Sequence, residues 1–114
     1  MPAAVLPPTV LPPTRVALVT GAAQGIGEAI SLQLADDGLD IALNDIPQKL
    51  NQLKAVATTI EAKGRRALIV TGDVTVEDDV VAMVRKTAAE LGALDVVLRA
   101  VLFFAGLRRL MMTS

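Results

Sequence analysis

Short apolar runs alternate with longer amphipathic stretches along most of this 114-residue chain. The runs are apolar almost throughout, which is typical of parallel strands that are covered on both faces of a sheet. They occupy residues 16–20, 39–44 and 67–71 and the segment from Val96 onward. Strands that alternate with helices in this way predict an α/β fold with about four parallel strands and three helices.

Each predicted helix carries one apolar stripe that is expected to cover the sheet. The stripes are Ile26, Ile30 and Leu34; Leu50, Leu53, Ala57 and Ile60; and Val80, Val84, Ala88 and Leu91. A glycine follows each stripe at the place where a helix-ending residue belongs, at Gly38, Gly64 and Gly92. Right-handed crossovers then give the strand order 3-2-1-4, which is part of a doubly wound parallel sheet.

A glycine-rich turn joins the first predicted strand to the first predicted helix. Residues 20–27 are Thr-Gly-Ala-Ala-Gln-Gly-Ile-Gly. Gly21 suits a tight turn, Gly25 leaves the backbone open to a pyrophosphate, and Gly27 lets the helix lie against the strand. The backbone N–H groups near Gly25 and Ile26 would then bind an anion at a positively polarised helix end. A three-glycine pattern also occurs in turns that bind no ligand, so the turn alone leaves both interpretations open.

An acid at the end of the second strand favours nucleotide binding. Asp45 lies 18 residues after Gly27. This is close to the spacing of about 20 at which a carboxylate reaches the ribose hydroxyls of adenosine. Together the turn and the acid predict a Rossmann-like dinucleotide-binding domain.

The Thr-Gly-x-x-x-Gly-Ile-Gly spacing resembles the short-chain dehydrogenase/reductase family, and the likeness covers residues 15–97. It is nearest to diacetyl/acetoin and 3-oxoacyl reductases, and implies an NAD(P)-binding oxidoreductase that acts on a small carbonyl or alcohol substrate. The resemblance implies NAD rather than NADP, because Asp45 is present and Gln24 replaces a basic residue. Asp73 and Val74 resemble the family's pair beside the adenine, with Asp73 on its exocyclic amine.

After residue 97 the sequence departs from the family pattern. The family's fourth strand runs into Asn-Asn-Ala-Gly, whereas this chain has Phe103-Phe104-Ala105-Gly106 after five further residues. The sequence contains no Tyr, so the family's Tyr-x-x-x-Lys segment is absent and no catalytic residue is assigned. The alternative to an oxidoreductase is a truncated, catalytically silent protein that binds nucleotide or associates with itself or with full-length relatives.

Composition argues against several other functions. The chain has neither His nor Cys, which disfavours a metal centre and removes disulfides. Its 11 basic and 12 acidic residues give a net charge of -1. Basic pairs such as Arg65-Arg66 are too scattered for a nucleic-acid-binding surface and are interpreted as solvated.

An acidic cluster precedes the third predicted helix. Glu77, Asp78 and Asp79 are adjacent in the sequence. They are interpreted as the first turn of the helix, with Thr75 and Asp78 forming a capping box, rather than as metal ligands.

Three segments are expected along the chain. Residues 1–14 form a Pro-rich flexible leader without the pattern of a secretory signal, 15–98 form the dinucleotide-binding half-domain, and 99–114 form a divergent apolar tail. The uncharged part of the tail, 100–107, is eight residues long, whereas a membrane span needs about 20. The expected location is therefore cytoplasmic, without membrane association.

Overall fold

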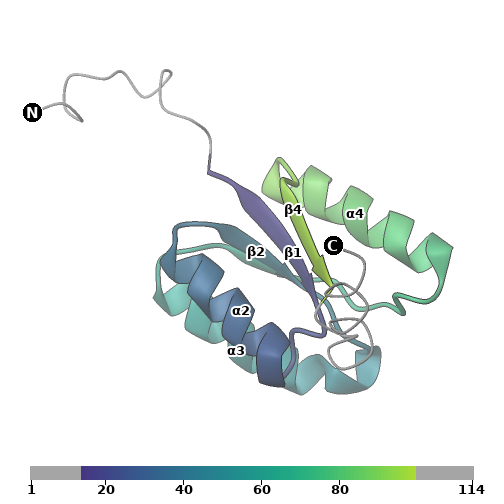
Figure 1. The fold of residues 1–114 in the computed structure, drawn as a ribbon, viewed down its shortest axis with the longest axis horizontal. Coiled ribbons are helices and arrows are strands. Elements are labelled where there is room, and N and C mark those ends of the chain that lie inside the picture. Colours follow the sequence, from purple (N-terminus) through teal and green to yellow (C-terminus); the bar gives the residue numbers. More distant parts are fainter. Residues whose placement is uncertain (1–13, 100–114) are drawn as a thin grey trace, which may run out of the picture.

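The computed structural model describes residues 14–99, which form one parallel sheet with helices on both faces (Figure 1). Its strands are β1 (Val16–Thr20), β2 (Asp40–Leu43), β3 (Ala67–Ile69) and β4 (Val96–Arg99). They lie in the order β3-β2-β1-β4, and every neighbouring pair is parallel. The predicted fold class and strand order are confirmed.

Three α-helices connect these strands. They are α2 (Gly25–Asp36), α3 (Leu50–Ala62), which the short 3-10 helix η2 (Pro47–Lys49) precedes, and α4 (Glu77–Leu91). Helices α2 and α3 cover one face of the sheet and α4 covers the other (Figure 1). No helix between residues 14 and 99 has both the length and the apolar character needed to cross a membrane.

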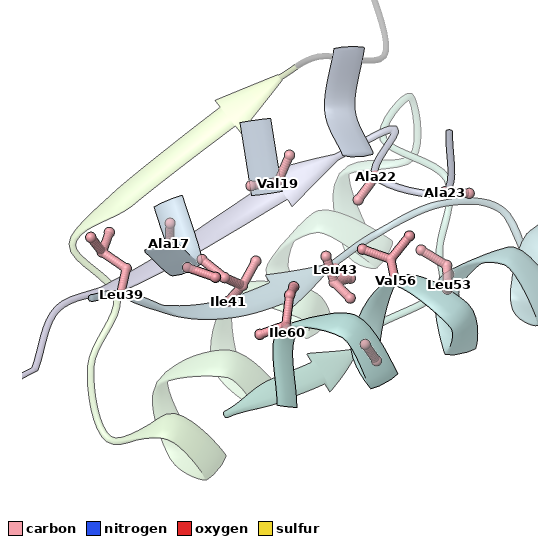
Figure 2. Packing of buried hydrophobic residues seen from close by; sticks show 12 residues of the cluster. Ala17, Val19, Ala22, Ala23, Leu39, Ile41, Leu43, Leu53, Val56 and Ile60 are labelled. Atoms are coloured by element: carbon pink, nitrogen blue, oxygen red, sulfur yellow. The ribbon is translucent and has the colours of Figure 1, made fainter. Parts of the chain in front are cut away.

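The larger core lies between the sheet and the pair α2 and α3 (Figure 2). Ile41 and Leu43 of β2 lie against Leu53 and Ile60 of α3, and all four side chains are fully buried. Burial of one such side chain contributes about 1.5–3 kcal/mol. A second cluster joins the opposite face of the sheet to α4, and the central strands β1 and β2 are buried along their whole length.

The buried face of α2 differs from the predicted stripe. Gly27, Ser31 and Ala35 are buried, whereas Ile26 is 44% exposed. The buried face is small and partly polar because the helix start lies close to the glycine turn, and the Ser31 hydroxyl is satisfied by donating to the Gly27 carbonyl at 2.8 Å. The prediction that Ile26 faces the core was wrong.

The stripes of the other two helices were predicted more closely. In α3, Leu53, Ala57 and Ile60 are buried as predicted, but Leu50 at the helix start is exposed. In α4, Leu91 is buried and Val80 and Val84 are half-buried, while Ala88 is exposed. The buried positions that sequence analysis missed in α4 are Met83 and Thr87.

The glycines predicted to end the helices were confirmed, whereas the capping box predicted for the start of α4 was not. Gly38, Gly64 and Gly92 have φ values of 98°, 85° and 85°, which is the left-handed region that favours glycine. The prediction of a capping box formed by Thr75 and Asp78 was wrong. Helix α4 has no side-chain cap at its N-terminus, because the Thr75 hydroxyl donates to Asp73 Oδ1 at 2.6 Å instead.

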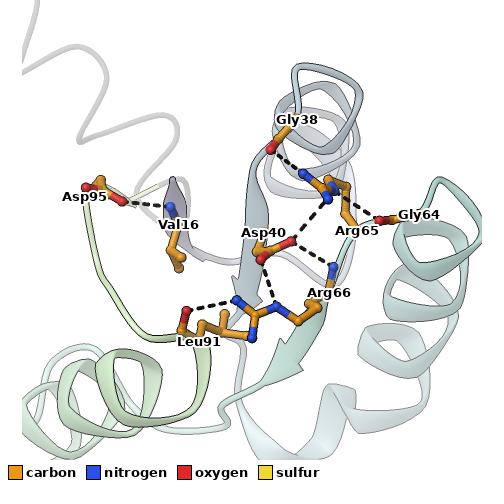
Figure 3. A network of polar contacts seen from close by, with 8 residues as sticks. All are labelled: Val16, Gly38, Asp40, Gly64, Arg65, Arg66, Leu91 and Asp95. Carbon is orange, nitrogen blue, oxygen red and sulfur yellow. Dashed lines mark hydrogen bonds and ion pairs between the residues drawn. The ribbon is translucent and has the colours of Figure 1, made fainter. Parts of the chain in front are cut away.

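Figure 3 shows a polar network where β2 begins, at the end of the sheet opposite the glycine turn. The Asp40 side chain is only 4% exposed, and it accepts hydrogen bonds from the backbone N–H and Nε of Arg66, both at 2.9 Å. Arg65 Nε lies 3.8 Å from Asp40 Oδ1, and Arg66 also donates to the Leu91 carbonyl. Arg66 is exposed, as predicted, but the two arginines also join β2, β3 and α4, which the interpretation as solvated residues did not include.

The predicted leader and apolar tail lie almost wholly outside the described residues. The same is true of the predicted departure at Phe103 and Phe104. Residues 15–98, the predicted half-domain, fall within the described part of the chain.

Candidate dinucleotide-binding site

The predicted cofactor-binding residues all follow the carboxyl ends of strands. The glycine turn follows β1, Asp45 follows β2, and Asp73 and Val74 follow β3. Because the strands are parallel, these three segments meet at one edge of the sheet. The strand order reverses between β1 and β4, because β2 and β3 follow on one side of β1 and β4 lies on the other. Ligands of open parallel sheets bind at such a point.

The glycine turn has backbone angles and contacts that favour glycine over residues with a side chain. Gly21 and Gly25 have φ values of 66° and 60°. A Cβ added to Gly25 would meet no atom within 4 Å, so this position faces open space. A Cβ added to Gly27 would overlap the Gly21 carbonyl oxygen and lie 2.6 Å from its carbonyl carbon. The turn is therefore open on its outer side at Gly25 and closely packed on its inner side at Gly27.

Helix α2 begins directly after this turn without a side-chain cap. Its N-cap residue, Gln24, has an extended backbone, and its side chain makes no capping hydrogen bond. The first N–H groups of a helix lack intrahelical acceptors and carry partial positive charge. An anion beside Gly25 and Ile26 would supply these acceptors.

Asp45 is tied to the glycine turn. Its Oδ2 accepts from the Ala23 N–H at 3.2 Å and its Oδ1 from the Ile46 N–H at 2.8 Å. The backbone of the preceding residue, Asn44, also pairs with this region, since Asn44 accepts from the Ala22 N–H at 2.9 Å. The carboxylate is thus held beside the turn before any ligand binds.

The sequence did not reveal that a cation, Lys49, contacts the glycine turn. Lys49 Nζ donates to Gln24 Oε1 at 3.1 Å and so links η2 to the glycine turn. The prediction of NAD assumed that no cation lies near position 24. Lys49 forms no ion pair with Asp45 in the part of the chain that the structure describes.

Asn44 is a second residue that sequence analysis missed. It is only 1% exposed, and its Nδ2 donates to the Val70 carbonyl at 2.8 Å and also lies 3.3 Å from the Gly72 carbonyl. Asn44 therefore joins the ends of β2 and β3. Its position at the end of an apolar run was visible in the sequence, but its partners were not.

Asp73 lies in an ordered turn after β3. Its Oδ1 accepts from both the hydroxyl and the backbone N–H of Thr75, at 2.6 and 2.8 Å. Both bonds lower the pKa of the exposed Asp73 carboxyl, and the bond from the hydroxyl has the larger effect. The neighbouring Val74 is half-buried against the core on the α4 side. The structure thus places an ionised carboxylate and an apolar side chain together at this edge.

Residues 15–109 match the family model of the short chain dehydrogenases. The chain belongs to this family. It is 51% identical over 82 residues to a short-chain dehydrogenase/reductase of Armillaria gallica. This match covers 72% of this chain and 31% of the relative. It is 43% identical over 83 residues to the L-2,3-butanediol dehydrogenase of Corynebacterium glutamicum, with 73% and 32% of the two chains covered.

A solved structure agrees with the family assignment. A blue fluorescent protein from a metagenomic library, in complex with NADPH, is 39% identical with a TM-score of 0.70, and the match covers 73% of this chain and 34% of that one. The predicted resemblance to the short-chain dehydrogenase/reductase family is confirmed. The chain spans about a third of the length of the curated relatives it matches.

Proposed function

We propose that this chain is the cofactor-binding half of a nicotinamide-dependent oxidoreductase of the short-chain dehydrogenase/reductase family. The observation that carries the proposal is the uncapped start of α2, which follows an open glycine turn and lies beside the fixed carboxylate of Asp45. A pyrophosphate beside Gly25 and a ribose beside Asp45 would satisfy both groups. The NADPH bound by the metagenomic protein supports a cofactor of this class.

Each predicted residue has a distinct task in this proposal. Gly21, Gly25, Ile26 and Gly27 form the turn that holds the pyrophosphate, and Asp45 binds the ribose. Asp73 and Val74 contact the adenine, the first through its carboxylate and the second through its apolar side chain. The cofactor supplies hydride transfer when bound, while the protein orients it.

We favour NAD over NADP for this site. A 2'-phosphate would meet the carboxylate of Asp45, and repulsion between two anions opposes its binding. Lys49 reduces this repulsion, because its ammonium group is bonded to Gln24 in the glycine turn. The expected preference is therefore for NAD, with NADP bound more weakly rather than excluded.

The proposed reaction transfers a hydride between the cofactor and a small carbonyl or alcohol. The name of the butanediol dehydrogenase relative supports this class of substrate. These 114 residues contain no Tyr, and general acid catalysis typically contributes a factor of about 10² to 10⁴. On their own they are accordingly expected to bind nucleotide without turnover, which keeps the catalytically silent protein as the second candidate. A cytoplasmic location is part of the proposal.

Calorimetric titration with NAD and NADP tests the proposal. Gly25→Val adds a branched side chain on the open side of the turn, where the pyrophosphate would lie, so affinity for both cofactors should be lost. Gly64→Val is the matched control, because Gly64 also has a positive φ and open space but lies at the end of α3. Equal affinities of the wild type and the Gly25→Val variant would refute the proposal.

A separate assay addresses turnover. Oxidation of NADH in the presence of diacetyl or acetoin is followed by the loss of NADH absorbance, beside a full-length family member. Binding without turnover is the expected result. Turnover that Gly25→Val abolishes would show that these residues catalyse the reaction without the family's Tyr.

A further inference from the structure

The loop after β3 is fixed by groups from two other segments. The Gly72 N–H donates to the Asp45 carbonyl at 3.1 Å, and Asn44 Nδ2 lies 3.3 Å from the Gly72 carbonyl. From the other side, Asp79 Oδ2 accepts the Asp73 N–H at 2.9 Å. Asp79 lies in the first turn of α4, so one side chain connects this helix to the backbone of Asp73.

The side chain of Asp73 is held in one orientation. Its Oδ1 takes both hydrogen bonds from Thr75, while its Oδ2 makes no hydrogen bond within residues 14–99. Since the two oxygens belong to one planar group, fixing Oδ1 and the backbone also fixes Oδ2. Asp73 is exposed, so Oδ2 can accept a hydrogen bond from a ligand.

Close packing lets Asp79 reach this loop. A Cβ added to Gly72 would lie 3.5 Å from the Asp79 Cβ and only 3.1 Å from Met83 Sδ. The absence of a side chain at Gly72 therefore allows the start of α4 to approach the loop. Asp79 is half-buried there, unlike its exposed neighbour Asp78.

We propose that Asp79 is a positioning residue for the adenosine end of the cofactor, because it holds the Asp73 backbone and thereby aims Asp73 Oδ2 at the exocyclic amine of adenine. This inference rests on the proposed function. In this proposal Asp79 acts through Asp73 and makes no contact of its own with the cofactor. Its effect is therefore confined to ligands that carry the amine.

The test compares NAD with nicotinamide hypoxanthine dinucleotide, in which a carbonyl oxygen replaces the exocyclic amine. A hydrogen bond to a charged group contributes enough free energy that the full chain should bind NAD roughly tenfold more tightly than the analogue. Asp79→Ala should remove most of this preference by weakening NAD alone. Asp79→Asn should retain most of it, because the amide oxygen still accepts the Asp73 N–H.

Two further variants make the result decisive. Asp78→Ala removes the same charge from the same helical turn and should keep the preference for NAD. Asp79→Glu keeps the charge but displaces the acceptor by one methylene, so it should lower the preference even if Asp79→Ala fails to fold. Circular dichroism establishes which variants fold.

Three other results would contradict either the positioning role of Asp79 or the proposed function. A wild-type ratio retained by Asp79→Ala, or by Asp79→Glu if the alanine variant is unfolded, would overturn the positioning role of Asp79. Equal wild-type affinity for the two dinucleotides would also overturn it, since the amine would then not be recognised. Failure of the wild type to bind either dinucleotide would instead overturn the proposed function.

Discussion

Replacement of Gly27 by Ala should both destabilise the protein and weaken nucleotide binding. The added Cβ would lie 2.6 Å from the Gly21 carbonyl carbon, whereas unstrained carbon atoms lie about 3.5–4.0 Å apart. The start of α2 must therefore move away from the turn by about 1 Å. Forced shifts of this kind typically cost about 1–3 kcal/mol. For a domain of this size, each 1 kcal/mol lowers Tm by about 4–8 °C, so we expect a decrease of roughly 4–24 °C.

Thermal unfolding followed by circular dichroism measures the loss of stability, and calorimetric titration with NAD measures the loss of affinity. Gly64→Ala provides the control. Gly64 has a φ of 85° and open space around its Cβ position, so the variant should show backbone strain of about 1–2 kcal/mol without loss of affinity. A Gly27→Ala protein with unchanged Tm and unchanged affinity would refute the argument that the turn and α2 are in close contact.

Two further predictions concern charge at the same edge. Lys49→Gln should widen the preference for NAD over NADP, because it removes the cation beside Gln24, and an unchanged ratio of affinities would contradict the effect proposed for Lys49. Asp45→Ala should narrow the preference, and an unchanged ratio would contradict the proposed ribose contact; titration of each variant with both cofactors measures the ratio. Thr75→Val removes the hydroxyl that contributes most to the lowered pKa of Asp73, so that pKa should rise toward its usual value. Binding that needs the ionised carboxylate should then fail at a higher pH in the variant than in the wild type. Carbon NMR of the Asp73 carboxyl checks the direction of the shift, and an unchanged pKa would show that the hydroxyl has no such effect.

The fold was predictable because its central strands, β1 and β2, are buried on both faces. Continuous apolar runs such as 16–20 identify central parallel strands without any tertiary information, and right-handed crossovers leave few strand orders. The exact face of a helix was less predictable. In α2 the stripe of large residues suggested that Ile26 is buried, but the contact with the glycine turn requires the small face that contains Gly27 and Ser31.

The candidate site was predictable only in its main-chain outline. Glycines and acids at fixed distances after strands identify which segments meet, because parallel strands bring their carboxyl ends to one edge. Lys49 and Asp79 were missed for the same reason as Asn44. The partner of Lys49 lies 25 residues away in the sequence, that of Asp79 lies 6 away and that of Asn44 lies 26 away. Only the folded structure shows which residues these partners are.

These missed contacts explain how separate loops are held together at the proposed site. Asp45 holds the glycine turn, Asn44 holds the end of β3, and Asp79 holds Asp73, so each group proposed to face the ligand is fixed by a neighbouring segment. A ligand that binds a surface already ordered loses less conformational freedom than one that must order the loops itself. The predicted residues alone therefore do not account for the site. Substitutions at the residues that hold them should change affinity for one part of the cofactor at a time, and the comparison of two dinucleotides that differ only at the adenine amine detects this directly.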